Sequence, residues 1–95
     1  MSAYIIAHMQ VSNPQQYEQY KTLAKVASEK YGGEYLARGG ELEVLEGDWH
    51  PPRVVIVKYP SMAKARAFYD SPEYREARNA REGAAVMSMV LVEGL

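Results

Sequence analysis

The stretch Arg53-Val54-Val55-Ile56-Val57-Lys58-Tyr59 predicts a strand buried on both faces, because its four central residues are all apolar. A second run of this kind extends from Ala84 to Glu93 and is also apolar at both parities. Strands of this type need a cover on both faces of the sheet. The fold therefore has to provide a cover for each face.

Two helices are expected to cover one of these faces. The first begins at Asn13-Pro14, where a capping residue precedes a proline, and ends at Gly32-Gly33. The second occupies residues 61–82 and is expected to break at Ser71-Pro72, which adds a second cap and a second proline. One stripe of the first helix carries residues interpreted as core, namely Tyr17, Tyr20, Ala24, Ala27 and Tyr31.

Two further strands are predicted on either side of the first helix. Residues 3–11 are rich in β-formers and apolar at both parities. Residues 34–37 and 41–46 are interpreted as one strand interrupted at Arg38-Gly39-Gly40, where paired glycines indicate a bulge or a tight bend. A loop, residues 47–52, then leads into the strand at 53–59.

The order β-α-β-β-α-β predicts an α+β fold of the ferredoxin-like type, with a four-stranded antiparallel sheet and both helices on one face. The 95 residues, 47% of them apolar, leave room for one domain spanning residues 1–95. The other face of the sheet would stay bare although its strands are apolar. A second copy of the chain is the simplest cover, so we expect a homodimer through the open sheet face.

The composition argues against several classes of protein. Eleven basic and twelve acidic residues leave a formal charge of −1, and residues 54–57 lack the basic-glycine-aromatic signature of RNA-binding sheets, so no nucleic-acid binding is expected. Cysteine is absent, and residues 1–8 contain neither a positive region nor an apolar run of membrane-spanning length. A cytoplasmic protein without a membrane partner is expected. With only His8 and His50, neither beside a carboxylate cluster, no metal, haem or other cofactor is expected.

Several segments together resemble the domain-of-unknown-function family numbered 1330, and the resemblance covers essentially the whole chain. It implies the ferredoxin-like fold and the sheet-to-sheet dimer of the dimeric α/β-barrel superfamily. That architecture is shared by cofactor-independent monooxygenases, isomerases, haem enzymes and non-enzymatic proteins, so the resemblance implies no particular activity. The segments that carry it are Tyr35–Gly40, Leu45–Trp49, Arg53–Ile56, Phe68–Tyr74 and Arg81.

A candidate ligand site combines the second helix with Arg38. Tyr69, Tyr74, Arg78 and Arg81 fall on or near one face of that helix, where they could hold a small anionic or aromatic ligand by charge-assisted hydrogen bonds and stacking. Alternatively, the tyrosines pack on the sheet and the arginines pair with neighbouring glutamates on a solvated helix face.

Four other residues are candidates for a functional role, and for each of them a purely structural role is the alternative. His8 could carry a proton near neutral pH or be a hydrogen-bonded core or interface histidine, whereas His50 is expected to face solvent. Glu46 shares the parity of apolar neighbours and could pair with Arg38 or Arg53, either as a structural ion pair or in a pocket. Trp49 is expected at a pocket rim, at an interface, or packed on its own domain.

Two hypotheses about function follow from these residues. In the first, the homodimer binds a small anionic or aromatic compound between sheet and helices, either as a binding protein or as a cofactor-independent enzyme. In the second, it is a non-catalytic structural or regulatory dimer module whose interior is closed by packing. The sequence alone leaves open whether the protein is an enzyme.

Overall fold

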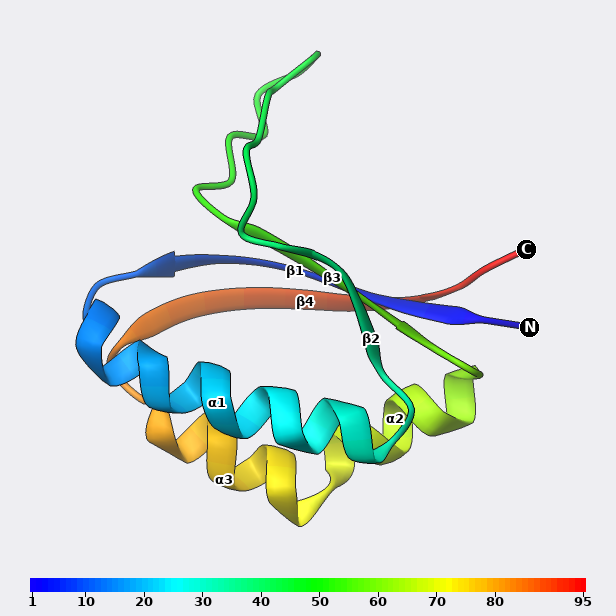
Figure 1. Ribbon diagram of the computed structural model, residues 1–95. Coiled ribbons are helices and arrows are strands. Elements are labelled where there is room, and N and C mark those ends of the chain that lie inside the picture. Colours follow the sequence, from blue (N-terminus) through cyan, green and yellow to red (C-terminus); the bar gives the residue numbers. More distant parts are fainter.

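The computed structural model describes all 95 residues, and Figure 1 shows a curved sheet with every helix on one side of it. The strands and helices follow the predicted order, and the second helix is divided into two helices at the predicted break. They are β1 (Ala3–Val11), α1 (Pro14–Lys30), β2 (Glu34–Arg38), β3 (Val54–Tyr59), α2 (Met62–Asp70), α3 (Pro72–Ala80) and β4 (Ala85–Glu93).

The four strands form one antiparallel sheet in the order β2-β3-β1-β4. The central strand β1 pairs with β4 from Ala3↔Glu93 to Val11↔Ala85, and with β3 from Ala3↔Tyr59 to His8↔Val54. Strands β1 and β3, which the sequence predicted to be buried on both faces, are the two inner strands of this sheet. The predicted α+β, ferredoxin-like fold is confirmed.

Local capping signals set the limits of the helices. The Asn13 side chain accepts a hydrogen bond from the backbone N–H of Gln16 at 3.1 Å, as predicted for the start of α1. The break between α2 and α3 falls at Ser71, whose hydroxyl accepts from the N–H of Tyr74 at 3.1 Å and donates to the carbonyl of Phe68 at 2.6 Å. One buried serine therefore ends one helix and starts the next.

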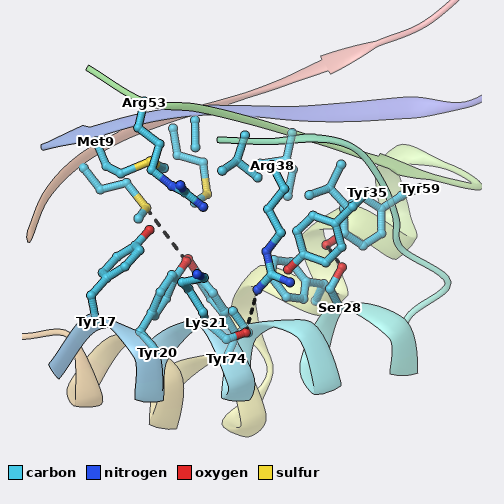
Figure 2. Close-up of a pocket in the computed structure, with 18 residues that line it drawn as sticks. Met9, Tyr17, Tyr20, Lys21, Ser28, Tyr35, Arg38, Arg53, Tyr59 and Tyr74 are labelled. Atoms are coloured by element: carbon cyan, nitrogen blue, oxygen red, sulfur yellow. Dashed lines mark hydrogen bonds between the residues drawn. The ribbon is translucent and has the colours of Figure 1, made fainter. Parts of the chain in front are cut away.

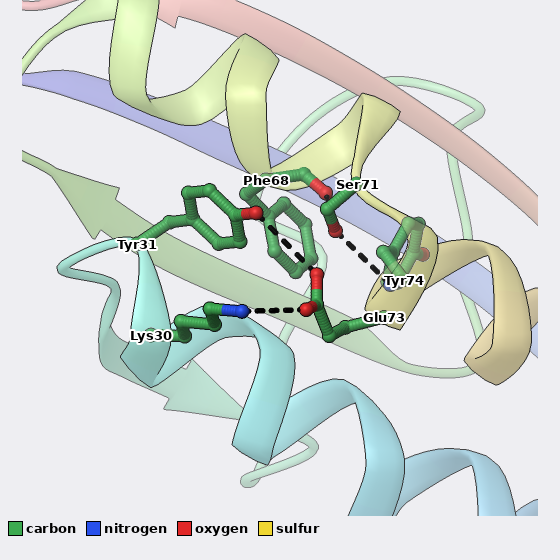
Figure 3. A network of polar contacts seen from close by, with 6 residues as sticks. All are labelled: Lys30, Tyr31, Phe68, Ser71, Glu73 and Tyr74. Carbon is green, nitrogen blue, oxygen red and sulfur yellow. Dashed lines mark hydrogen bonds and ion pairs between the residues drawn. The ribbon is translucent and has the colours of Figure 1, made fainter.

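A polar contact joins the end of α1 to the start of α3 (Figure 3). The Lys30 ammonium lies 2.6 Å from the carboxylate of Glu73, and the Tyr31 hydroxyl donates to the same carboxylate at 3.4 Å. The hydrogen bond from Lys30 lowers the pKa of Glu73 below its ordinary value. The two helices thus pack side by side under the sheet with a charged contact at their ends.

The helices bury one face of the sheet and leave the other open. Along β1 the odd-numbered residues Ala3 to Met9 are buried, whereas the even-numbered ones are half-buried or exposed. On β4 the open face carries Val86, Val90 and Val92, whose exposed fractions are 78%, 60% and 47%. The chain itself supplies no cover for these apolar side chains.

One predicted strand segment does not exist. Residues 41–46 do not extend β2; instead, residues 40–52 form an arm that projects from the sheet on the side opposite the helices (Figure 1). No backbone–backbone hydrogen bond involves the arm, because β3 ends its pairing with β2 at Arg38↔Val55 and offers no further partner. Gly39, at φ 73°, turns the chain out of the sheet at this point.

Candidate functional site

A cavity of about 40 Å³ lies between the helix-covered face of the sheet and the helices (Figure 2). Since a buried water needs roughly 10–15 Å³ of such space, the cavity has room for about three waters or an equally small group. Its lining is mostly apolar. The residues labelled in Figure 2 are Met9, Tyr17, Tyr20, Lys21, Ser28, Tyr35, Arg38, Arg53, Tyr59 and Tyr74.

Two arginines reach into the cavity from the sheet (Figure 2). Arg38, the last residue of β2, crosses to α1 and donates to the backbone carbonyl of Lys21 at 2.8 Å, with its guanidinium 4.5 Å from the centre of the Tyr35 ring. Arg53 enters from the residue before β3, and its Nε is buried without a hydrogen-bond partner. One guanidinium is therefore bound within the chain, while the other retains a free buried donor.

The charges around the cavity are unbalanced. No aspartate or glutamate is among its lining residues, so neither arginine has a carboxylate partner there. The third cation, Lys21, directs its ammonium to Glu18 at 3.1 Å instead. An anion that enters this cavity therefore meets uncompensated positive charge. The attraction between them is stronger there than in water, because charges interact more strongly away from water.

Phenol groups supply most of the remaining polar atoms. The hydroxyls of Tyr20 and Tyr74 are 2.8 Å apart, and those of Ser28 and Tyr59 are 2.9 Å apart. Burial raises the pKa of Tyr20 and of Tyr59 far above the ordinary tyrosine value. Burial also raises the pKa of Tyr17 and Tyr35, although the positive charges of Arg53 and Arg38 respectively oppose this. The phenols of Tyr17, Tyr20, Tyr35 and Tyr59 are therefore neutral at physiological pH.

A surface groove continues from one end of the cavity. The groove has a volume of about 500 Å³ and shares Met9, Tyr17, Lys21 and Arg53 with the cavity. Arg53 therefore lies where the buried space meets the surface.

The structure divides the predicted ligand-binding cluster. Arg38 and Tyr74 line the cavity, as does Arg53. Arg78 instead stacks on Tyr69 with 4.7 Å between the guanidinium carbon and the ring centre, and donates to its hydroxyl at 3.1 Å on the exposed surface. Arg81 lies over the Tyr20 ring at 5.2 Å, with a buried Nε that has no partner.

His8 lies apart from this cluster. Its even position on β1 places it on the open face of the sheet, where its ring meets that of Trp49 edge-on at 5.6 Å between centroids. The prediction that His8 serves a site between sheet and helices together with Arg38 is wrong in this respect. Both parities of β1 are apolar, so the pattern could not tell which face the helices cover. His50 is exposed, as expected.

The predicted ion pair of Glu46 is also absent from the chain. Its parity with apolar neighbours has no meaning outside a strand, and Glu46 lies exposed on the arm. None of the three ion pairs joins it to Arg38 or Arg53. Trp49, 58% exposed, borders a second groove of about 610 Å³ between the arm and the open face.

Sequence reasoning missed several cavity residues because it interpreted their helical stripe as ordinary core. Tyr17 and Tyr20 are buried as predicted, yet both line the cavity. A usable signal was present: the chain has eight tyrosines and one phenylalanine. A core built from tyrosines needs polar partners for its hydroxyls, which indicates a polar interior.

No helix has the length and hydropathy needed to cross a membrane. No group of three or more histidine, aspartate or glutamate side chains is arranged to hold a metal ion.

The chain belongs to the family described as domain of unknown function (DUF1330), whose sequence model matches residues 2–95. None of the curated proteins matches it.

Solved structures share its fold. A protein of unknown function from Rhodopseudomonas palustris has a TM-score of 0.78 at 24% identity, covering 99% of this chain and 82% of that one. A dimeric ferredoxin-like protein of unknown function from Jannaschia sp. CCS1 has a TM-score of 0.77 at 10% identity, covering 99% and 100%. SnoaB, a cofactor-independent oxygenase from Streptomyces nogalater, has a TM-score of 0.71 at 13% identity, covering 99% and 93%. At these identities the likeness is one of fold.

Proposed function

We propose that this member of the DUF1330 family is a homodimer that binds a small anionic or aromatic compound in the cavity between its sheet and its helices. One observation carries the proposal: two arginines line a mostly apolar cavity that contains no carboxylate. Both arginines are half-buried, and a charge that is withdrawn from water into an apolar lining is costly unless it is paired. A bound anion would supply the missing partner.

The homodimer is supported by the open face of the sheet. Its exposed valines need a cover, and the arm projects from the same face with Leu42, Val44 and Leu45 exposed. Leu45 is 88% exposed, and with the other apolar side chains of the arm and the open face it belongs to an exposed apolar surface of the kind that marks an interface. Dimeric proteins among the solved structures of this fold support a homodimer.

In a catalytic version of the same proposal, the protein is a cofactor-independent enzyme. The shared fold of SnoaB, a cofactor-independent oxygenase, favours this version. The cavity contains neither histidine nor carboxylate, and the phenols of Tyr20 and Tyr59 are neutral, so no strong general base is present among these groups. Its arginines would instead stabilise negative charge that develops on the substrate. Such an enzyme would act on a compound that is already anionic or readily loses a proton.

The small volume of the cavity favours the second candidate function, a non-catalytic dimer module. About 40 Å³ excludes a whole aromatic ring unless the side chains at the groove move apart. In that case the arginines and tyrosines would only position the helices on the sheet.

A thermal-melt panel of short carboxylates, aromatic acids and phenols separates the two candidates. Binding to the folded state raises the melting temperature, by linkage, for the wild type. We expect at least one anion to do so, and the rise to shrink in Arg38→Gln. A flat response to every compound, together with a native mass spectrum of a bare dimer, would support the non-catalytic module. Native mass spectrometry would also reveal a bound compound carried through purification.

A further inference from the structure

We infer that Arg53 binds the carboxylate of a small monocarboxylic acid at the junction of cavity and groove, and that Gly39 is the residue that positions Arg53 for this. The inference rests on the ligand-binding function proposed above and identifies the ligand class and the anchoring residue.

Arg53 differs from Arg38 in what its guanidinium already contacts. Arg38 is bound to the Lys21 carbonyl and stacked on Tyr35. The Arg53 side chain interacts with the Tyr17 phenol, but its buried Nε has no partner; Figure 2 shows its guanidinium between the sheet and the rings of Tyr17 and Tyr20. A buried donor without a partner is costly. An acceptor at this point would remove that cost, and it could reach Arg53 through the groove.

Gly39 allows the guanidinium to lie where it does. A Cβ built on residue 39 would lie 1.9 Å from Nη1 and 2.3 Å from Cζ of Arg53, so the arginine occupies the space that a side chain would need. The backbone of Gly39 also has φ 73°, a conformation that favours glycine. The N–H of Gly39 donates to the carbonyl of Val54 at 3.0 Å, which holds the two segments together. Gly39 is therefore a positioning residue for Arg53.

The surroundings of Arg53 select a monocarboxylate over other anions. A guanidinium presents two parallel N–H donors that match the two oxygens of a carboxylate. The apolar lining disfavours a phosphate dianion, because its second charge would also have to leave water. With room for about three waters beyond Arg53, the cavity fits a short aliphatic tail, while any larger part of the ligand would lie in the groove.

Sodium butyrate is the probe for the test, with butyramide as its neutral counterpart and inorganic phosphate as the competing anion. A titration followed by ¹H–¹⁵N correlation spectra of the whole protein reports both affinity and place, because the Arg53 Nε–Hε group has its own signal. We expect butyrate to shift that signal with saturation, and butyramide and phosphate to leave it in place. Arg53→Gln should weaken butyrate binding roughly ten- to a hundredfold, as for loss of a hydrogen bond to a charged group. Arg53→Lys should restore only part of the affinity.

The two adjacent glycines provide a matched pair of variants. Gly39→Ala should move the Arg53 Nε–Hε signal before any butyrate is added and weaken butyrate binding as Arg53→Gln does. Gly40→Ala should change neither, because a Cβ there meets no atom within 4 Å. If Gly39→Ala does not fold, a twofold-or-less effect of Arg53→Gln on butyrate affinity still overturns the inference.

The remaining outcomes separate this inference from the broader proposal. Butyrate binding that survives in Arg53→Gln but is lost in Arg38→Gln would leave the ligand-binding function standing and assign the anchor to Arg38. If butyramide or phosphate binds as tightly as butyrate, the assignment of the ligand as a monocarboxylate is overturned, while the ligand-binding function still stands. If neither the carboxylates nor the other compounds of the thermal-melt panel bind the wild type, both proposals fall together.

Discussion

At the scale of single residues, the interior is organised by hydroxyl pairs. Tyr74 is fully buried, and its hydroxyl bonds that of Tyr20, which otherwise has only the sulfur of Met87 at 3.9 Å. A buried hydroxyl that loses its partner retains the cost of leaving water. The tyrosine pairs therefore contribute to stability even when no ligand is present.

Replacing Tyr74 by phenylalanine tests this contribution. Tyr74→Phe should lower the free energy of unfolding by about 1–3 kcal/mol, because the Tyr20 hydroxyl stays buried without a good partner. Tyr69→Phe is the control: its hydroxyl bonds Arg78 on the exposed surface, and we expect a loss of less than about 0.5 kcal/mol. Urea unfolding of the three proteins measures both values. Equal losses in the two variants would show that burial of the pair is unimportant.

At the scale of the elements, the junction of α2 and α3 depends on Ser71. Its hydroxyl satisfies a backbone donor of α3 and a backbone acceptor of α2 at the same time. Ser61, the cap of α2, makes one such bond, to the N–H of Lys64 at 3.2 Å, and is less buried. The two serines have the same local sequence role but different surroundings.

The two caps should therefore differ in their effect on stability. Ser71→Ala should cost about 2 kcal/mol, near the upper end of measured cap losses, since both backbone groups lose their partner inside the protein. Ser61→Ala should cost about 0.5–1 kcal/mol, because water can replace the lost bond. Thermal unfolding of the two variants beside the wild type gives the comparison. A larger loss for Ser61→Ala would contradict this account of the junction.

At the scale of the whole molecule, the two faces of the sheet have different roles. The helix-covered face contains the cavity, while the open face and the arm expose apolar side chains. The first face should respond to proton and ligand concentration, and the second to protein concentration.

The tyrosines of the covered face predict a loss of stability in alkali. Burial raises the pKa of Tyr17, Tyr20, Tyr35 and Tyr59, so the folded state holds these protons more tightly than the unfolded chain. The resulting stability is complete at a pH below about 10, the ordinary tyrosine value, and is lost as the pH rises above it. Circular dichroism and tyrosinate absorbance should therefore change together above that pH. Full ionisation of all eight tyrosines with an unchanged dichroism spectrum would be incompatible with this assignment.

The open face predicts a stability that depends on protein concentration. The melting temperature of the wild type should rise with concentration, because association stabilises the folded state. Val90→Lys places a charge on the open face and should convert the proposed dimer to a monomer. Val26→Lys is matched in chemistry and exposure (64% against 60%) but lies on α1, so it should leave the dimer intact. Sedimentation velocity distinguishes these states; a dimer that tolerates Val90→Lys and not Val26→Lys would place the interface on the helices.

The sequence by itself determined the order of the elements, the limits of all of them except β2, and the need for a second cover on the sheet. These features depend on local signals, such as the cap at Asn13, the serine-proline break at Ser71 and the apolar runs of β3 and β4. Such signals act within a few residues, where backbone geometry and capping decide the outcome. The segment 41–46 has a strand-like composition but forms no strand, because a strand also needs a neighbouring partner.

Only the tertiary structure decided which side chains meet. Parity on β1 separates His8 from Met9, but the packing of the helices decides that Met9 faces the cavity and His8 the open sheet. The contacts of Gly39 with Arg53 and of Tyr20 with Tyr74 join residues that lie 14 and 54 positions apart in the chain. No local pattern encodes such distances, because they follow from how whole elements pack against one another. The candidate site is therefore a property of the packed molecule.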